Sequence, residues 1–255
     1  MSIVFFVYLA AFGLMIGSFL NVCIGRLPAG ESIVSPPSRC PHCHTPIRWR
    51  DNIPVLSYLL LGGRCRACRA SISARYPAIE AATAAAFVVQ GIWFHDEPIL
   101  LAQRLVFTAI LVVLFGTDLE TQRLPNVITY PGIIVGLLFS VWVPPGIVAC
   151  AMGAAAGALV LWLIRRTWKR VTGVVGMGLG DVKMMALIGA FLGWRQILVV
   201  LFLSSFTGAI IGMGLAIVRG KSMKTRLPFG TFLAVAAYVA SLVGERLVTW
   251  YVGLY

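Results

Sequence analysis

The chain has 255 residues, of which 59% are hydrophobic and only 12% are charged. A soluble domain carries roughly 25% charged residues, so this composition excludes an ordinary soluble protein and indicates a membrane protein. The formal net charge is +12, which in a multi-pass membrane protein is typical of basic cytoplasmic loops rather than of nucleic-acid binding. We therefore expect the lipid bilayer, and no nucleic acid, as a partner.

The first apolar segment covers residues 3–24. No basic stretch precedes it and no convincing small-residue cleavage site follows, so the pattern favours a transmembrane helix over a cleaved secretory signal. Further apolar segments predict an all-α polytopic membrane protein with about eight transmembrane helices. These segments are residues 77–94, 99–117, 127–143, 146–164, 182–193, 196–218 and 228–250.

The basic residues are distributed unevenly between the two sides of this arrangement. With eight spans, 18 of the 21 Lys and Arg fall on one side, in or beside residues 25–76, 118–126, 165–181 and 219–227. The positive-inside rule then predicts that these loops are cytoplasmic and that both termini are periplasmic. The expected organisation is a first transmembrane helix at 1–24, a cytoplasmic loop domain at 25–76 and a seven-helix membrane domain at 77–255.

Pairs of glycines four residues apart recur in the apolar segments. Small residues at this spacing let two helices approach closely, so we expect a compact helix bundle. The pairs are Gly13 and Gly17, Gly153 and Gly157, Gly189 and Gly193, and Gly208 and Gly212.

Four cysteines in the polar loop form two C-x-x-C pairs that are separated by 21 residues. This spacing is typical of a tetrahedral zinc site with four thiolate ligands, and a reducing cytoplasm disfavours disulfides. A structural zinc ion would also fold a loop that is too small for its own core. The alternatives are unmetallated thiols or redox pairs. The predicted zinc ligands are Cys40, Cys43, Cys65 and Cys68.

Two aspartates lie at the edges of apolar segments. Asp118 follows the run LVFTAILVVLFGT, and Asp181 precedes VKMMALIGAFLG. Carboxylates at membrane depth are costly and usually functional. The charge-based topology places both at cytoplasmic ends of their helices, so neighbouring helices would bring them together.

Two adjacent carboxyl groups share a proton, so one can activate water while the other protonates a peptide carbonyl or leaving amine. We therefore predict an aspartic protease with Asp118 and Asp181 as its catalytic pair. One alternative is that each aspartate caps a helix or pairs with Lys183 or Arg123. Others are a transporter or channel that uses the aspartates as a proton relay, and a membrane scaffold with a zinc-bearing docking loop.

Five motifs carry a resemblance to the type IV prepilin peptidase family over residues 13–234: GSFLNVCIGRLP, CPHC with CRAC, TDLETQRLPN, GMGLGDVKMMALIGAFLG and PFGTFLA. The resemblance implies an aspartic endopeptidase of the bacterial inner membrane, with Asp118 and Asp181 as the catalytic pair. It would remove the basic leader of type IV prepilins or pseudopilins at the cytoplasmic face.

Family members with the cysteine loop commonly also N-methylate the new terminal residue with S-adenosylmethionine. This expectation rests on the resemblance alone, because no glycine-rich fingerprint locates a cofactor site. The residues between the cysteine pairs are candidates for contacting the substrate or the methyl donor. They are Trp49, Arg50, Asp51, Asn52, Pro54 and Tyr58.

The chain departs from the family pattern at two positions. Asn126 stands where Asp is common, and Thr231 stands where Pro is common. We expect neither residue to touch the aspartate pair.

Overall fold

The computed structural model describes residues 2–219 and 228–253. The described part is helical, with isolated β-bridges only in the polar loop. Most of the predicted basic loop at 219–227 lies outside the described residues. The chain forms two compact units, Met1–Leu101 and Ala102–Tyr255. The division falls within the long helix α4 (Pro98–Thr121).

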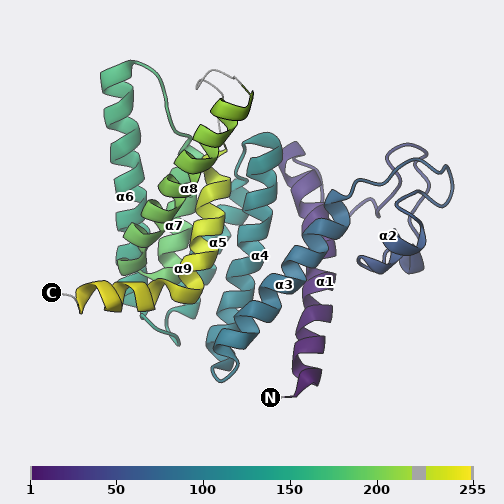
Figure 1. Ribbon diagram of the computed structural model, residues 1–255, viewed down its shortest axis with the longest axis horizontal. Coiled ribbons are helices and arrows are strands. Elements are labelled where there is room, and N and C mark those ends of the chain that lie inside the picture. The colour runs from purple at the N-terminus through teal and green to yellow at the C-terminus, as the bar shows by residue number, and fades with distance from the viewer. Residues whose placement is uncertain (1, 220–227, 254–255) are drawn as a thin grey trace. The chain divides into compact units, whose positions relative to one another are not determined.

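The first unit is built on helices α1 (Ile3–Arg26) and α3 (Arg75–Phe94), which lie side by side (Figure 1). A Cβ on Gly13 would lie 2.6 Å from Ala84 Cα, and one on Gly17 would lie 2.7 Å from Glu80 Cα. The predicted close packing at this glycine pair is therefore confirmed. The polar segment between the helices contains only short elements, which are η1 (Leu27–Ala29), η2 (Trp49–Asp51) and α2 (Leu56–Leu60).

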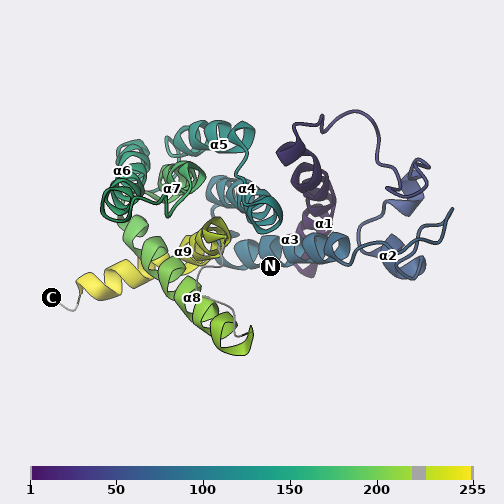
Figure 2. The ribbon, with the colours of Figure 1, turned by 90° about the horizontal axis from the view of Figure 1, so that it is seen from above.

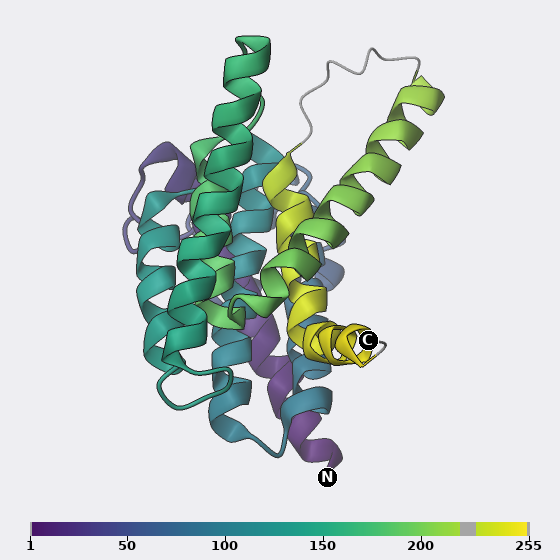
Figure 3. The same ribbon diagram turned by 90° about the vertical axis from the view of Figure 1, so that its left-hand side faces the viewer.

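The second unit is a helix bundle around α7 (Leu179–Leu192), which contacts the other helices of the unit (Figure 2). It packs most closely on α5 (Asn126–Phe139), α6 (Ile147–Thr172), α8 (Arg195–Arg219) and α9 (Phe229–Val252), and it also contacts α4, where Phe107 stacks on Phe191. Helices α8 and α9 also run side by side (Figure 3). The helix that begins beside Asp181 is thus at the centre of its unit.

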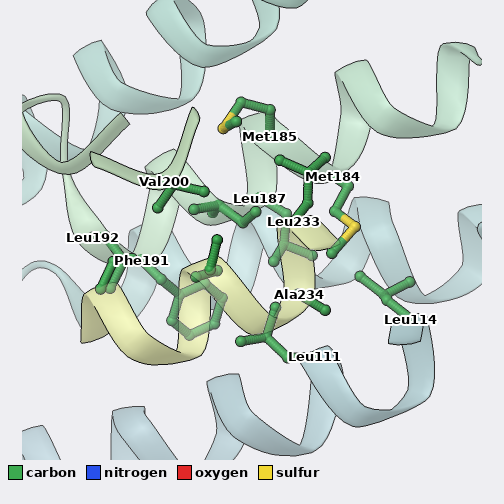
Figure 4. Packing of buried hydrophobic residues seen from close by; sticks show 14 of the residues in the cluster. Leu111, Leu114, Met184, Met185, Leu187, Phe191, Leu192, Val200, Leu233 and Ala234 are labelled. Atoms are coloured by element: carbon green, nitrogen blue, oxygen red, sulfur yellow. The ribbon is translucent and has the colours of Figure 1, made fainter. Parts of the chain in front are cut away.

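Nearly the whole of α7 is buried, because its apolar side chains interdigitate with those of α4 and α9 (Figure 4). Its contact with α6 is unusually close: a Cβ on Gly189 would lie 2.2 Å from the carbonyl oxygen of Gly153. Gly208 differs, since a Cβ there would meet Phe232 at an ordinary 3.5 Å. The close packing predicted from glycine spacing therefore occurs between α6 and α7 but not at Gly208.

Among the described residues, six helices are long and apolar enough to cross a membrane, namely α1, α3, α4, α6, α8 and α9. The prediction of an all-α multi-pass membrane protein is confirmed. The predicted spans at 127–143 and 182–193 correspond to α5 and α7, which have 14 residues each. Such a helix is only about 21 Å long, against about 30 Å for the hydrocarbon core. The count of eight spanning helices is therefore approximate.

Candidate active site and metal centre

The structure brings together the two aspartates that the sequence singled out. Asp118 lies near the end of α4 and is 4% exposed, whereas Asp181 lies in the first turn of α7 and is 8% exposed. Their carboxyl groups interact electrostatically. Both residues belong to the second unit, so the packing of one bundle positions them.

Asp118 is held by the beginning of α9. The backbone N–H of Thr231 donates to Asp118 Oδ2 at 2.8 Å, and the Thr231 hydroxyl lies 3.4 Å from the same oxygen. The first N–H groups of a helix have no partner within the helix, and here Asp118 supplies an acceptor from α4. A Cβ on Gly230 would lie 2.9 Å from Asp118 Cγ. A glycine at this position therefore allows the carboxylate to approach the helix end.

The expectation that neither departure from the family pattern touches the aspartate pair is wrong for Thr231, which binds Asp118 directly. Asn126 instead accepts a hydrogen bond of 2.8 Å from Lys183 Nζ, two residues after Asp181. The contact from Thr231 runs mainly through its backbone N–H, at 2.8 Å, rather than through its hydroxyl, at 3.4 Å. The available signal was that PFGT starts a helix, whose first N–H groups need acceptors.

Asp181 caps its own helix. The N–H of Gly178, the residue before α7, donates to Asp181 Oδ2 at 3.1 Å. Asp181 is the third residue of α7, and an acidic side chain there often reaches back to the capping position. The capping alternative is therefore confirmed for Asp181, while Lys183 binds Asn126 and not an aspartate. Capping engages one carboxyl oxygen and leaves the second available for chemistry.

The segment that leads into Asp181 rests on the end of α6, which extends to Thr172 and beyond the predicted limit at 164. Arg165 Nε donates to the carbonyl oxygen of Met177 at 3.1 Å. A Cβ on Gly176 would lie 2.6 Å from Trp168 Cδ1, so this glycine lets the backbone lie against the indole ring. The additional turns of α6 thereby hold the chain segment that precedes Asp181 in place.

The four predicted metal ligands converge in the first unit, where their Sγ atoms all lie within 4.8 Å of one another. The Sγ atoms of Cys40 and Cys68 are 3.8 Å apart. In a tetrahedral site with Zn–S bonds of about 2.3 Å, sulfur atoms are about 3.8 Å apart. Hydrogen bonding with Thr45 lowers the pKa of the Cys43 thiol to about 6, whereas burial and hydrogen bonds with the neighbouring thiols raise the pKa of Cys68 to about 11. The cluster could therefore hold a metal ion.

The two C-x-x-C segments adopt the same turn. The N–H of His44 donates to the carbonyl of Cys40 at 2.9 Å, and the N–H of Arg69 donates to the carbonyl of Cys65 at 3.0 Å. His44 and Arg69 both have positive φ angles, of 57° and 60°. A local repeat of the backbone thus presents both cysteine pairs in the same way.

A buried carboxylate that was not predicted from the sequence anchors the loop to α3. Glu80 is 8% exposed, and its Oε2 accepts a hydrogen bond of 2.7 Å from the N–H of Val55. Val55 has a φ of +59°, which is a strained conformation for a β-branched residue. The signal for Glu80 was an acidic residue inside the predicted span 77–94.

A cavity of about 420 Å³ lies between α1 and the polar loop. Of the candidate contact residues between the cysteine pairs, Asn52 and Pro54 line this cavity. Asp51 instead binds Arg66 at 2.7 Å, and this guanidinium holds the pKa of Asp51 below its usual range. The loop therefore separates into a segment that faces the cavity and a segment that supports the cysteine turns.

Comparisons with known proteins cover both units. Residues 11–94 match the bacterial peptidase A24 N-terminal domain, and residues 105–213 match the type IV leader peptidase family. No solved structure matches the chain.

Curated relatives match over nearly their whole length. A prepilin leader peptidase/N-methyltransferase of Aeromonas salmonicida is 41% identical, over 94% of this chain and 91% of the relative. Proteins of the same name from Pseudomonas putida and Dichelobacter nodosus are 40% and 38% identical, over 95% and 96% of this chain and 92% and 93% of the relatives. The resemblance seen in the motifs is thereby confirmed, and the chain belongs to the type IV leader peptidase family.

Proposed function

We propose that this protein removes the basic leader peptide of type IV prepilins or pseudopilins and then N-methylates the new terminal residue. The observation that carries the proposal is that two buried aspartates, Asp118 and Asp181, lie close enough to influence each other electrostatically, and that each accepts a backbone N–H at the start of a helix. The names of relatives that are about 40% identical over nearly the full chain support the same activity.

The geometry suits hydrolysis by a pair of carboxyl groups. Thr231 donates to Oδ2 of Asp118 and Gly178 donates to Oδ2 of Asp181, so both carboxyl groups are held in place by backbone N–H groups beside the position where water or substrate would bind. One carboxylate takes a proton from water, whose oxygen attacks the peptide carbonyl carbon. The other carboxyl group protonates the carbonyl oxygen. As the C–N bond breaks, the first carboxyl group gives the proton that it took from water to the leaving amine. A proton relay for transport is less favoured, because both aspartates lie near helix ends.

The four cysteines are proposed to hold zinc as a structural ion. Their sulfur-only donor set and the 3.8 Å separation of Cys40 and Cys68 fit a closed tetrahedral site. Such a site has no free position for a substrate, so its task is to fold the loop.

The positive-inside bias supports a multi-pass protein of the bacterial inner membrane. In this arrangement the zinc loop at 25–76 and both aspartates face the cytoplasm, and the two termini are periplasmic. The seven-helix region at 77–255 then carries the peptidase. The basic leader of the substrate would lie in the cytoplasm. It would end where the apolar helix of the substrate enters the membrane, and the aspartates would lie at that depth.

S-adenosylmethionine is the proposed methyl donor. When bound, it would supply a methyl group to the new terminal amine: the N–C bond forms as the methyl–sulfur bond breaks, the amine loses a proton, and S-adenosylhomocysteine leaves. The name of the relatives supports this second activity.

The test is to incubate the purified protein in detergent with a model prepilin and S-adenosylmethionine. Mass spectrometry of the product is expected to show a leader-free chain that carries one added methyl group on its terminal amine. An intact prepilin after incubation with folded protein would contradict the peptidase proposal. A cleaved but unmethylated product would contradict the methylation proposal alone.

A further inference from the structure

Helix α2 carries three exposed leucines on one face. Leu56, Leu59 and Leu60 follow the i, i+3, i+4 spacing of neighbours on a helix surface, and they are 49%, 67% and 77% exposed. The opposite face is turned inward. Ser57 is 7% exposed, and its hydroxyl donates to the carbonyl of Arg50 at 3.0 Å and accepts a backbone N–H at 3.0 Å. These two hydrogen bonds fix the orientation of the short helix, so its leucine face points away from the loop.

The position of α2 along the spanning helices is set by Glu80. The N–H of Val55, the residue before α2, donates to the buried carboxylate of Glu80 at 2.7 Å. Glu80 lies five residues after the start of α3 at Arg75, which is about 7.5 Å along a helix that is about 30 Å long. The hydrocarbon core of a bilayer is also about 30 Å thick. Helix α2 therefore begins alongside the outer part of a membrane-spanning helix and not beyond its end (Figure 1).

Other parts of the polar loop also run alongside a spanning helix. The cavity of about 420 Å³ is lined by α1 residues from Met15 to Arg26, by loop residues between 33 and 38, and by Asn52 and Pro54. Met15 and Arg26 are 11 residues apart, which is about 16 Å along a helix. The loop thus returns along the last turns of α1. This arrangement places α2 at the depth where lipid head groups meet acyl chains.

The residues around the leucine face are those of a membrane interface. Trp49 is 84% exposed, and tryptophan is enriched where head groups meet acyl chains. Between residues 48 and 69 there are five arginines, all exposed, and a single acidic residue, Asp51. Arginine is well suited to binding phosphate through paired N–H groups. A basic peptide would be repelled by this segment, whereas a phospholipid surface complements both its charge and its leucine face.

From the leucine face, its depth and the surrounding charges, we propose that α2 inserts into the lipid leaflet on the loop side of the membrane. Leu56, Leu59 and Leu60 contact acyl chains, Trp49 lies among the head groups, and the arginines contact lipid phosphates. The loop that carries the four cysteines is then attached to the membrane at a third point, in addition to α1 and α3. The inference does not rest on the proposed function, because it concerns where the loop lies and not which reaction the protein catalyses.

The test is photocrosslinking of the full-length protein in nanodiscs of phosphatidylethanolamine and phosphatidylglycerol. Leu59 is replaced by the photoreactive residue p-benzoylphenylalanine, which inserts into nearby C–H bonds, and mass spectrometry identifies what it has bound. We expect adducts with phospholipid. The matched control carries the same photoreactive residue at Ala67, an exposed position of the same loop that lies between Arg66 and Arg69. No lipid adduct is expected there.

Two results of this experiment would overturn the proposal. Adducts of position 59 with peptides, from this protein or from another, would show that a protein surface covers the leucines. Lipid adducts that are absent at position 59, or that are equally abundant at positions 59 and 67, would show that the leucine face has no preferred contact with lipid. Metal content is measured in both variants, so that only protein with an intact cysteine cluster is compared.

A charged variant tests the same contact without a photoreactive group. Leu59→Asp combined with Leu60→Asp would place two carboxylates against acyl chains, which is costly, so the loop should leave the membrane. We expect faster proteolysis within residues 31–74 in nanodiscs, with metal content unchanged because both leucines are exposed. The control adds the same charge at two other exposed positions, Ala67→Asp with Ser71→Asp. Proteolysis at the wild-type rate, or loss of metal from the leucine variant alone, would contradict insertion.

Discussion

The two sites of this protein are held together by different means. Asp118 and Asp181 are buried at helix ends, and each receives a hydrogen bond from a backbone N–H group. The cysteine cluster lies in a loop with few regular elements, and three of its four cysteines are partly or fully exposed. The comparison indicates that helix packing fixes the aspartates, whereas the cysteine turns depend on the metal ion that we propose they bind. Substitutions at each site should show whether helix packing or metal binding holds its residues in place.

Metal removal should have the largest effect, and it should be confined to the loop. Structural zinc contributes about 10–16 kcal/mol to the folding of small zinc domains, so replacing all four ligand cysteines by serine should unfold the loop. We expect loss of bound zinc by elemental analysis and rapid proteolysis within residues 31–74. Cys150→Ser is the matched control, because Cys150 is buried in α6 of the other unit. Unchanged zinc content in the quadruple variant would refute the metal site.

Neutralising either aspartate should greatly slow leader cleavage without unfolding the bundle. Asp118→Asn keeps an oxygen that can accept the Thr231 N–H, and Asp181→Asn keeps one for Gly178. Loss of a general acid or base should lower kcat about 10²–10⁴-fold, while zinc content and thermal unfolding in detergent stay close to wild type. Asp96→Asn is the control, because this side chain is 88% exposed and its carboxylate binds only His95 among the described residues. Normal cleavage by either dyad variant would contradict the assignment.

The close contact between α6 and α7 should be sensitive to a single methyl group. In Gly189→Ala the new Cβ would lie 2.2 Å from the Gly153 carbonyl oxygen, so the helices must separate, at a cost of about 1–3 kcal/mol. We expect a lower thermal midpoint and slower cleavage, with zinc content unchanged. Gly208→Ala is the matched control, because its Cβ would meet only Phe232 at 3.5 Å. Equal stability of the two variants would show that the bundle is less tightly packed than the contact implies.

The smallest effect is expected at Thr231. Thr231→Pro removes the N–H that donates to Asp118 at 2.8 Å, whereas Thr231→Val removes only the hydroxyl, whose contact is 3.4 Å. Loss of one hydrogen bond is worth about 1 kcal/mol, so kcat for cleavage should fall roughly fivefold with Pro and less with Val. KM should change little, because the contact is to the aspartate and not to the substrate. A larger loss with Val than with Pro would assign the effect to the hydroxyl.

Side-chain chemistry was enough to propose both candidate sites, because the two aspartates and the four cysteines are recognisable in the sequence by type and spacing. The contact between Thr231 and Asp118 was not predictable in the same way, since it joins positions 113 apart through a backbone N–H that every residue except proline has. Glu80 was missed for a different reason. Its partner is the N–H of Val55, and the positive φ of Val55 could not be predicted from the amino-acid sequence.

Helix lengths were predicted less well than helix positions. Hydropathy alone extended the fourth predicted span to residue 143, but α5 ends at Phe139. It also stopped the fifth at 164, although α6 continues to Thr172 with several basic residues in its last turns. Hydropathy measures compatibility with lipid, whereas a helix can continue into water or end early among neighbouring helices.

Because Asp118 is hydrogen-bonded to α9, the position at which the chain is truncated matters. The match to the type IV leader peptidase family ends at residue 213, whereas the backbone donor to Asp118 belongs to Thr231. A shortened chain that ends with the family match would therefore contain both aspartates yet lack the helix end that one of them binds. A truncated chain should therefore end beyond Val252, and a chimaera with a relative should be joined beyond that residue.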